Sequence, residues 1–270
     1  MRASITPGTG QVVVGGWWPS RGVTSTVLGR SPRRVLMIGS DARILKHQRV
    51  DRSRADALQV VGVDGQGGGG VMGIARDLWV TTPSGSHTKI NAAMATGGPL
   101  VQQQTVTRAS GLSLDGYIVI GFTSFTALAN ELGKVTITLP SPVRGHSGTV
   151  TLNGADALWV ARERKSLPGG DFDRSRNQGI LLAGFGALAR AKGPTALPGI
   201  LTKVSTHSQS NLSAEQALTF GGWAYRTNPL KMGHGVAKGT PAMRSGQSVV
   251  PIGSQARALF ADFQDGTINR

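Results

Sequence analysis

The stretch "RRVLMIGSDAR", residues 33–43, contains an apolar run from Val35 to Ile38 that is followed by small and polar residues up to Asp41. A short apolar run of this kind is typical of a buried β-strand that leads into a loop. Comparable runs occur further along the chain in "DALQVVGVD" (56–64), "VMGIARDLWV" (71–80) and "DGYIVIGF" (115–122). We therefore predict a group of buried strands with polar residues at their ends.

Helical patterns lie between and after these strands. "TSFTALANELG" (123–133) has an apolar face and ends at Gly133, as an amphipathic helix does. Strands that alternate with helices over the whole length predict α/β class: a single domain with a central mixed β-sheet flanked by helices. "KVTITLP" (134–140) alternates and is predicted to be a half-exposed strand. Further helices are predicted in residues 87–98, 99–111, 153–164, 171–192, 213–226 and 255–266.

The composition limits the classes of protein to consider. The 270 residues are enough to bury a substantial core, and the absence of cysteine excludes disulfides, thiolate zinc sites and a cysteine nucleophile. Lysine and arginine number 29 against 14 acidic residues, for a formal charge of +15. Such a surface favours polyanionic partners: nucleic acid, anionic lipid head groups or phosphate-rich polymers. No apolar run approaches the roughly 18 to 20 residues of a membrane-spanning helix.

Charged residues gather where the predicted elements begin or end. In an open α/β sheet, ligands bind beyond the carboxyl ends of the strands, where the residues after Ile38 would lie. On a helix, Asp171, Arg174 and Gln178 are spaced i, i+3 and i+7 and therefore share a face. The clusters comprise Asp41 with Arg43, Arg54 with Asp56, Arg76 with Asp77, and a later group of Arg162, Arg164, Asp171, Arg174 and Gln178.

These clusters are compatible with two kinds of site. Converging arginines repel one another unless an anion or carboxylates compensate them, and a pyrophosphate with a divalent cation would do so. Arginine forks would bind the phosphate oxygens, while Asp41 and Asp56 would give Mg²⁺ hard oxygen ligands. The alternative is a surface lattice of Asp–Arg ion pairs at helix ends. Spacing alone leaves both open.

Several of these stretches, in this order, closely resemble the LytR-CpsA-Psr (LCP) family. The resemblance implies an LCP fold over residues 33–270 as the catalytic domain, preceded by a flexible Gly-rich arm over residues 1–32. Two departures, Ala75 where the family usually has proline and Lys134 where it usually has glycine, remove no functional group. The resemblance is carried by "VLMIGSDAR", "RADALQVVGVD", "VMGIARDLWV", "TKINAAMATGG", "LGKVTITLP", "LNGADALWVARER" and "DFDRSRNQ".

The family resemblance implies a function and a location. It implies a Mg²⁺- or Mn²⁺-dependent phosphotransferase that moves a glycopolymer from a polyprenyl-pyrophosphate carrier onto a peptidoglycan hydroxyl, with pyrophosphatase activity when water replaces the acceptor. It also implies an extracytoplasmic place at the cell membrane or cell wall, with a transmembrane anchor that this chain does not show. The expected partners are the lipid-linked glycopolymer, the peptidoglycan acceptor and the membrane surface, and not nucleic acid.

The resemblance also implies roles for individual residues. Asp41 and Asp56 would hold the metal, and Asp171 would orient the arginines or help to place the metal. Lys89 occupies the family's "KIN" position near the head group. These three aspartates and Arg76 would thus be the catalytic residues. The residues expected to bind the pyrophosphate are Arg54, Arg76, Arg162, Arg164, Arg174 and Gln178.

A polyprenyl tail would need an apolar groove between the sheet and the helices. Ordinary core packing is the simpler role for each apolar side chain that could line it, so the groove is a hypothesis at this stage. The candidates are Ile118, Ile120, Phe122, Phe125, Leu128, Leu181, Leu182 and Phe185.

Two functions of other classes remain as alternatives. A DNA-binding transcriptional attenuator would bind duplex DNA with steep salt dependence, but the sequence shows no helix-turn-helix or basic heptad pattern. A non-catalytic polyanion-binding wall protein would bind the lipid carrier without metal-dependent turnover.

Overall fold

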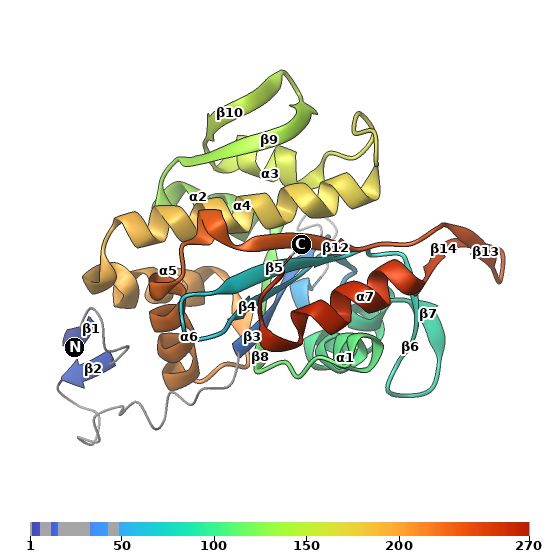
Figure 1. Ribbon diagram of the computed structural model, residues 1–270, viewed down its shortest axis with the longest axis horizontal. Helices are drawn as coiled ribbons and strands as arrows, with labels where there is room; N and C mark the ends of the chain where they lie inside the picture. The colour runs from blue at the N-terminus through green and yellow to red at the C-terminus, as the bar shows by residue number, and fades with distance from the viewer. Residues whose placement is uncertain (1, 6–11, 16–32, 43–48, 270) are drawn as a thin grey trace.

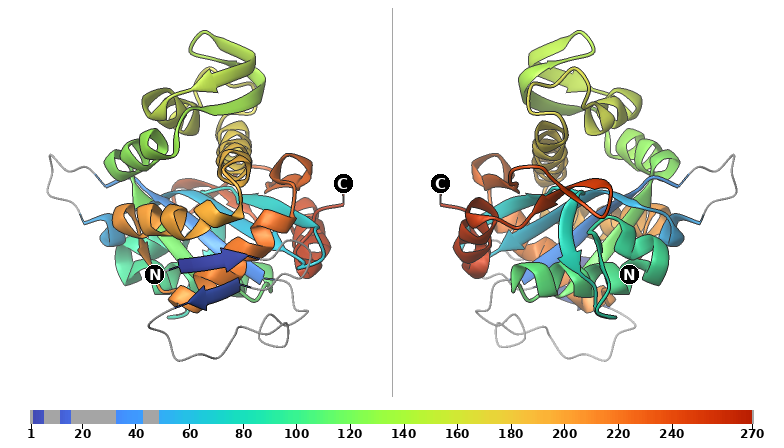
Figure 2. Two further views of the ribbon diagram at one scale, coloured as in Figure 1. Left: turned by 90° about the vertical axis from the view of Figure 1, so that its left-hand side faces the viewer. Right: turned by 90° about the vertical axis from the view of Figure 1, so that its right-hand side faces the viewer.

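The computed structural model describes residues 2–5, 12–15, 33–42 and 49–269. The predicted arm, residues 1–32, lies outside these ranges apart from two short strands, β1 (Arg2–Ile5) and β2 (Val12–Gly15), which pair antiparallel. The rest of the described chain forms two larger sheets, a β-hairpin and the helices around them (Figure 1 and Figure 2).

A mixed sheet forms the centre of the described chain, with the strand order β11-β8-β3-β4-β5-β12. β3 is parallel to β8 and antiparallel to β4, and β12 is parallel to β5. The predicted α/β class with a central mixed sheet is therefore confirmed. The strands are β3 (Arg33–Ser40), β4 (Ala55–Val63), β5 (Gly69–Ile74), β8 (Gly116–Gly121), β11 (Gln209–Ser210) and β12 (Gly233–Ala237).

Helices cover both faces of this sheet (Figure 1). α4 crosses one face, with α2 beside it, and α1 and α7 lie against the other face. α5 and α6 stand at one end of the sheet, next to each other. The helices are α1 (Ala92–Ser110), α2 (Phe122–Leu132), α3 (Gly154–Arg162), α4 (Asp171–Ala191), α5 (Leu197–His207), α6 (Ala214–Arg226) and α7 (Ser254–Asp262).

Within the described residues, two main apolar cores and a small cluster of Val63 and Trp223 hold these layers together. The larger core lies on the α1 and α7 face of the sheet and includes Leu36, Leu58 and Phe263. The smaller core joins α3 and α4 to a hairpin of β9 (Val135–Val143) and β10 (His146–Leu152), which stands above the sheet in Figure 1. β9 alternates buried and exposed residues, which confirms the predicted half-exposed strand.

Residues 87–111 show one correction and two confirmations. The helix predicted from residue 87 begins only at Ala92, because His87–Lys89 forms the short strand β7, paired antiparallel with β6 (Leu78–Thr81). The predicted division into two helices is confirmed, since Gly98 has φ of 80° and breaks the helical backbone within α1. The predicted end at Gly111 is also confirmed, because this residue caps α1 in the left-handed conformation.

Other elements depart from the sequence analysis. The run 71–80 was predicted as one interrupted strand, but a turn at Ala75–Asp77 divides it into β5 and β6, which belong to different sheets. β6 joins β7, β13 (Ala242–Arg244) and β14 (Gln247–Pro251) in a second sheet. α5, β10 and the strands after residue 232 were not predicted. Within the described residues, none of the helices is long and apolar enough to cross a membrane.

Candidate functional site

A cavity of about 560 Å³ lies between the central sheet and the helices α2 and α4. Its floor is one face of the sheet, to which β4 contributes the alternate residues Ala57, Gln59 and Val61. α5, α6 and the 3₁₀ turn η4 (Pro229–Lys231) close its far end. The cavity is mostly apolar. Most of its charged residues lie where β3, β4 and β5 meet the start of α4, whereas Arg190 lines it near the end of α4.

A chain of ion pairs occupies this charged end. Arg76 donates from Nη1 to Oδ1 of Asp56 at 2.9 Å, and its Nε lies 3.5 Å from Oδ1 of Asp171. The same oxygen of Asp171 lies 2.7 Å from Nη2 of Arg174, one turn along α4. Arg174 also donates to the backbone carbonyl of Asp56 at 3.3 Å. The i, i+3 spacing at the start of α4 thus joins two carboxylates and two guanidiniums into one group.

Burial and charge act differently on the two arginines. Burial by itself lowers the pKa of Arg76, but Asp56 and Asp171 outweigh it, so the net pKa is raised. Arg174 is more deeply buried, and burial lowers its pKa; Asp171 opposes this effect and the nearby charge of Arg76 adds to it. A further negative charge between the two guanidiniums would therefore be stabilised.

Nε of each arginine is buried and makes no hydrogen bond within the described part of the chain. Nε of Arg76 nevertheless faces Oδ1 of Asp171 at 3.5 Å, so it already has an opposite charge beside it. A buried donor without a hydrogen bond costs about 1–3 kcal/mol. Nε of Arg174 is therefore the donor that an additional anion would satisfy.

Asp41 follows β3 and lines the same cavity as Asp56. Its Oδ1 accepts from the backbone N–H of Arg54 at 2.9 Å, and its own N–H donates to the carbonyl of Arg54 at 3.1 Å. These two bonds tie the end of β3 to the start of β4 and fix the position of Asp41. Arg43, from the same predicted cluster, lies outside the described residues.

The other side of the charged end comes from the α3–α4 region. Arg162, the last residue of α3, stacks its guanidinium 4.4 Å from the ring centroid of Phe122. Arg164 follows in the loop, and Gln178 projects from α4 and donates to the carbonyl of Ala161 at 2.8 Å. The three polar side chains line the cavity with the ion-paired arginines.

The structure brings together most of the predicted site and leaves two residues apart from the cavity. Lys89 pairs with Asp77 at 2.9 Å, and the side chain of Arg54 is exposed; neither residue lines the cavity. Asp171 reaches the site through its contacts with Arg76 and Arg174. The predicted residues that line the cavity are Asp41, Asp56, Arg76, Arg162, Arg164, Arg174 and Gln178. Within the described chain, no group of three or more His, Asp or Glu could hold a metal ion.

The apolar part of the cavity contains every residue proposed for a lipid groove. Each of them borders the cavity, and the lipid groove stays a prediction. These residues are Ile118, Ile120, Phe122, Phe125, Leu128, Leu181, Leu182 and Phe185. The far end of the cavity was not predicted from the sequence; there α5 contributes Leu197, Ile200, Leu201 and Val204. Their spacing of i, i+3, i+4 and i+7 is that of an amphipathic helix and could have revealed α5.

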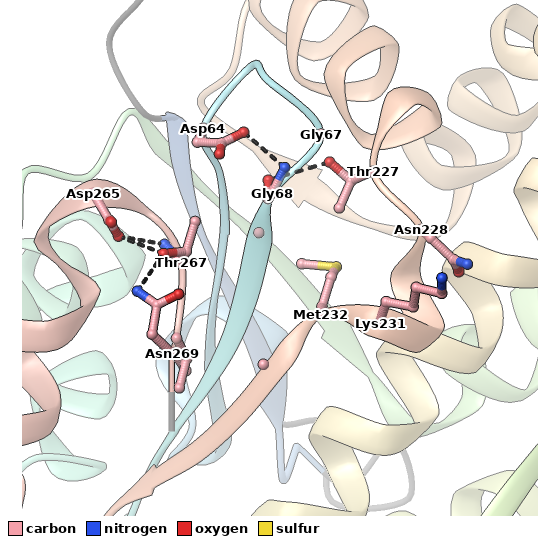
Figure 3. A pocket seen from close by; sticks show the side chains of 13 residues that line it. Asp64, Gly67, Gly68, Thr227, Asn228, Lys231, Met232, Asp265, Thr267 and Asn269 are labelled. Atoms are coloured by element: carbon pink, nitrogen blue, oxygen red, sulfur yellow. Dashed lines mark hydrogen bonds between the residues drawn. The ribbon is translucent and has the colours of Figure 1, made fainter.

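A second pocket lies at the opposite ends of β4 and β5 (Figure 3). Its two carboxylates are engaged by their own turns. Asp64 accepts from the N–H groups of Gln66 and Gly68, and Asp265 accepts from the N–H and hydroxyl of Thr267. These bonds close local turns, so the groups suited to chemistry are those of the first cavity.

An apolar chamber that ends in arginines and carboxylates has the chemistry to accommodate an amphiphile with an anionic head group. Similar proteins of known structure and sequence indicate the family of this chain. A crystal structure of Bacillus subtilis TagV superimposes with a TM-score of 0.71 at 23% identity, covering 88% of this chain and 99% of that one. In sequence, the chain is 29% identical over 206 residues to the B. subtilis polyisoprenyl-teichoic acid–peptidoglycan teichoic acid transferase TagV, and 28% identical over 207 residues to TagT of the same organism. Each match covers 70% of this chain.

The model of the LytR_cpsA_psr family matches residues 19–250. The chain belongs to this family, as the sequence resemblance predicted. Its matches span 52% of TagV and 63% of TagT, so the chain covers only part of the length of these relatives.

Proposed function

We propose that this protein is a phosphotransferase that moves a glycopolymer from a polyprenyl-pyrophosphate carrier to peptidoglycan. The observation that carries the proposal is the apolar cavity that ends at Arg76 and Arg174, with Asp41 and Asp56 in the same lining. The polyprenyl tail suits the apolar part, and the pyrophosphate suits the charged end. The names of TagV and TagT, which describe transfer of polyisoprenyl-linked teichoic acid to peptidoglycan, support it.

The proposed reaction is a phosphoryl transfer. A hydroxyl oxygen of peptidoglycan attacks the phosphorus atom that carries the glycopolymer. A new P–O bond forms, the bond to the bridging oxygen breaks, and polyprenyl monophosphate leaves with that electron pair while the hydroxyl proton is released. Charge grows on the phosphate oxygens, where Arg76 and Arg174 would stabilise it. Water in place of the hydroxyl would give hydrolysis of the carrier.

Asp41 and Asp56 are the proposed metal ligands. Mg²⁺ commonly takes one or two carboxylates and completes its shell with substrate phosphates and water, so two aspartates at the charged end fit such an ion. When bound, the metal would neutralise charge on the pyrophosphate. In the described contacts between these two residues, the guanidinium of Arg76 bonds Oδ1 of Asp56 and not Oδ2.

The proposal includes a location and partners. Lipid-linked glycopolymer and peptidoglycan meet outside the cytoplasm, at the membrane surface or the cell wall. The formal charge of +15 would favour an anionic membrane surface.

The test is phosphate release from geranylgeranyl pyrophosphate by the purified protein, with and without Mg²⁺. Wild type is expected to turn over only with the metal. Arg76→Ala removes the guanidinium between Asp56 and Asp171, and turnover should fall at least about a hundred-fold. The matched control is Arg244→Ala, which removes an exposed arginine of β13 that does not line the cavity and should leave the rate unchanged.

Metal-dependent turnover that is lost only in Arg76→Ala would support the proposed site. If Arg76→Ala and Arg244→Ala both kept the wild-type rate, the paired arginines would not be the reaction centre. If the protein bound the pyrophosphate but turned it over neither with nor without Mg²⁺, non-catalytic polyanion binding would replace the proposal. If it bound neither the pyrophosphate nor vesicles that contain it, the proposal would fail.

A further inference from the structure

Gln59 is a polar side chain in an apolar part of the cavity floor. It lies on β4 between Ala57 and Val61, lines the cavity and is only 2% exposed. An amide buried among apolar groups costs about 1–3 kcal/mol unless it is hydrogen-bonded. Its hydrogen-bond partners therefore decide what it does.

The partners of Gln59 fix the direction of its amide. Nε2 donates to the backbone carbonyl of Ser175 at 2.9 Å, and it lies 3.2 Å from the hydroxyl of Ser175 and 3.4 Å from Oε1 of Gln178. A backbone carbonyl only accepts, so the end of Gln59 that faces α4 must be Nε2. Gln178 must then present its Oε1 to Gln59.

The other end of Gln178 is fixed in the same way. Its Nε2 donates to the carbonyl of Ala161 at 2.8 Å. An amide nitrogen has two N–H groups, so one remains for the cavity that Gln178 lines. The opposite orientation would place the amide oxygen there, and an oxygen would repel an anion.

We call the hydrogen-bonded chain from Gln59 through Gln178 to the carbonyl of Ala161 the relay. Two glycines make room for it. A Cβ at Gly73 would lie 3.2 Å from both polar atoms of the Gln59 amide, and one at Gly179 would lie 3.3 Å from its Oε1. Neither glycine has a positive φ, so space rather than backbone conformation is what they provide. The Oε1 of Gln59 has no hydrogen-bond partner in the described chain, so the bonds made by Nε2 are what hold this amide in place.

We propose that Gln59 is a positioning residue for pyrophosphate binding, which acts by holding the Gln178 amide with an N–H toward the head group. The inference rests on the proposed function. Because Ala161 precedes Arg162, the relay from β4 through α4 also ties the sheet to the end of α3, where a second head-group residue lies.

The first test measures binding of geranylgeranyl pyrophosphate and of geranylgeraniol, which lacks the phosphates. Gln59→Met keeps a similar volume but removes the amide. We expect the Kd for the pyrophosphate to rise about five-fold, as the loss of one hydrogen bond predicts, and the Kd for the alcohol to stay equal or fall. Gln102→Met is the matched control, because Gln102 is fully buried in α1 and bonds Met94 away from the cavity. It should change neither Kd.

A double-mutant cycle separates positioning from a purely structural role. If Gln59 acts through Gln178, Gln59→Met should add no further loss of pyrophosphate binding to Gln178→Met. An equal loss in both backgrounds, or an equal change for pyrophosphate and alcohol, would overturn the inference. Thermal unfolding checks that each variant folds, and Gln59→Leu replaces Gln59→Met if the latter melts at the assay temperature.

The two proposals fail in different ways. If wild type showed no preference for the pyrophosphate over the alcohol and Arg76→Ala had no effect, the proposed function itself would be rejected. A wild-type preference that depends on Arg76 but persists unchanged in Gln59→Met would reject only the role of Gln59.

Discussion

Asp171 holds two arginines with a single carboxylate oxygen, which lies 3.5 Å from Nε of Arg76 and 2.7 Å from Nη2 of Arg174. The spacing of Asp171 and Arg174 was visible in the sequence, because residues three apart share a helix face. The contact with Arg76 was not visible, because Arg76 follows a different element and precedes Asp171 by 95 residues (171 − 76).

Replacing Asp171 removes the negative charge that lies between Arg76 and Arg174, so these two guanidiniums should repel each other more strongly. We expect Asp171→Asn to lower the stability by about 1–3 kcal/mol, below the full cost of breaking a buried pair because the side chain is partly exposed. Inorganic pyrophosphate should then raise the Tm of Asp171→Asn more than that of wild type, since the anion replaces the lost charge. A smaller rise in the variant would contradict this account.

At the scale of elements, α4 depends on a close approach to β9. A Cβ at Gly184 would lie 2.6 Å from the side chain of Ile137 and 2.8 Å from that of Val135. We expect Gly184→Ala to destabilise the fold by about 1–3 kcal/mol through overpacking. Gly199→Ala in α5 is the control, because a Cβ there meets nothing within 4 Å. It should stabilise by about 0.5–1 kcal/mol. Urea unfolding of both variants checks the opposite signs.

The contact between α2 and α5 should depend on pH. His207 lies 2.8 Å from Oε1 of Glu131, and this hydrogen bond, with the charges of His207 and Lys203, lowers the pKa of Glu131. A lowered pKa means that the ionised carboxylate stabilises the fold above its unfolded pKa of about 4.3, and that this stability is lost as the pH falls through the lower folded value.

Glu131→Gln should therefore remove part of the acid sensitivity. We expect the Tm of wild type to fall more steeply than that of the variant as the pH is lowered below about 4.3. Glu215→Gln, on the exposed face of α6, is the matched control. Identical slopes for wild type and Glu131→Gln would show that this contact does not hold α5 to α2.

At the scale of the whole molecule, the cavity is enclosed by the central sheet together with the helices α2, α4, α5 and α6 on one of its faces. Leu182 of α4 lines it, whereas Leu100 of α1 is 52% exposed on the other side. We expect Leu182→Trp to fill the chamber and weaken binding of geranylgeraniol about ten-fold or more. Leu100→Trp should bind as wild type. Unchanged binding in Leu182→Trp would remove this part of α4 from the lipid site.

The sequence by itself determined the features that depend on local pattern. Apolar runs predicted β3, β4, β5 and β8 of the central sheet, and glycines marked the ends of α1 and α2. The family resemblance named most of the charged residues that line the cavity, but not Arg190. The split of residues 71–80 between two sheets was not predictable, because strand partners are chosen by the whole fold.

Only the tertiary structure decided what depends on contacts between distant segments. It separated Lys89 from the cavity by pairing it with Asp77, and it placed Gln59 of β4 against Gln178 of α4. It also showed that apolar side chains of a packed core, such as Leu181, border a cavity at the same time. The physical reason is that helix and strand periodicity fixes which face a side chain occupies, whereas packing of the layers decides whether that face meets another side chain, a charge or an open cavity.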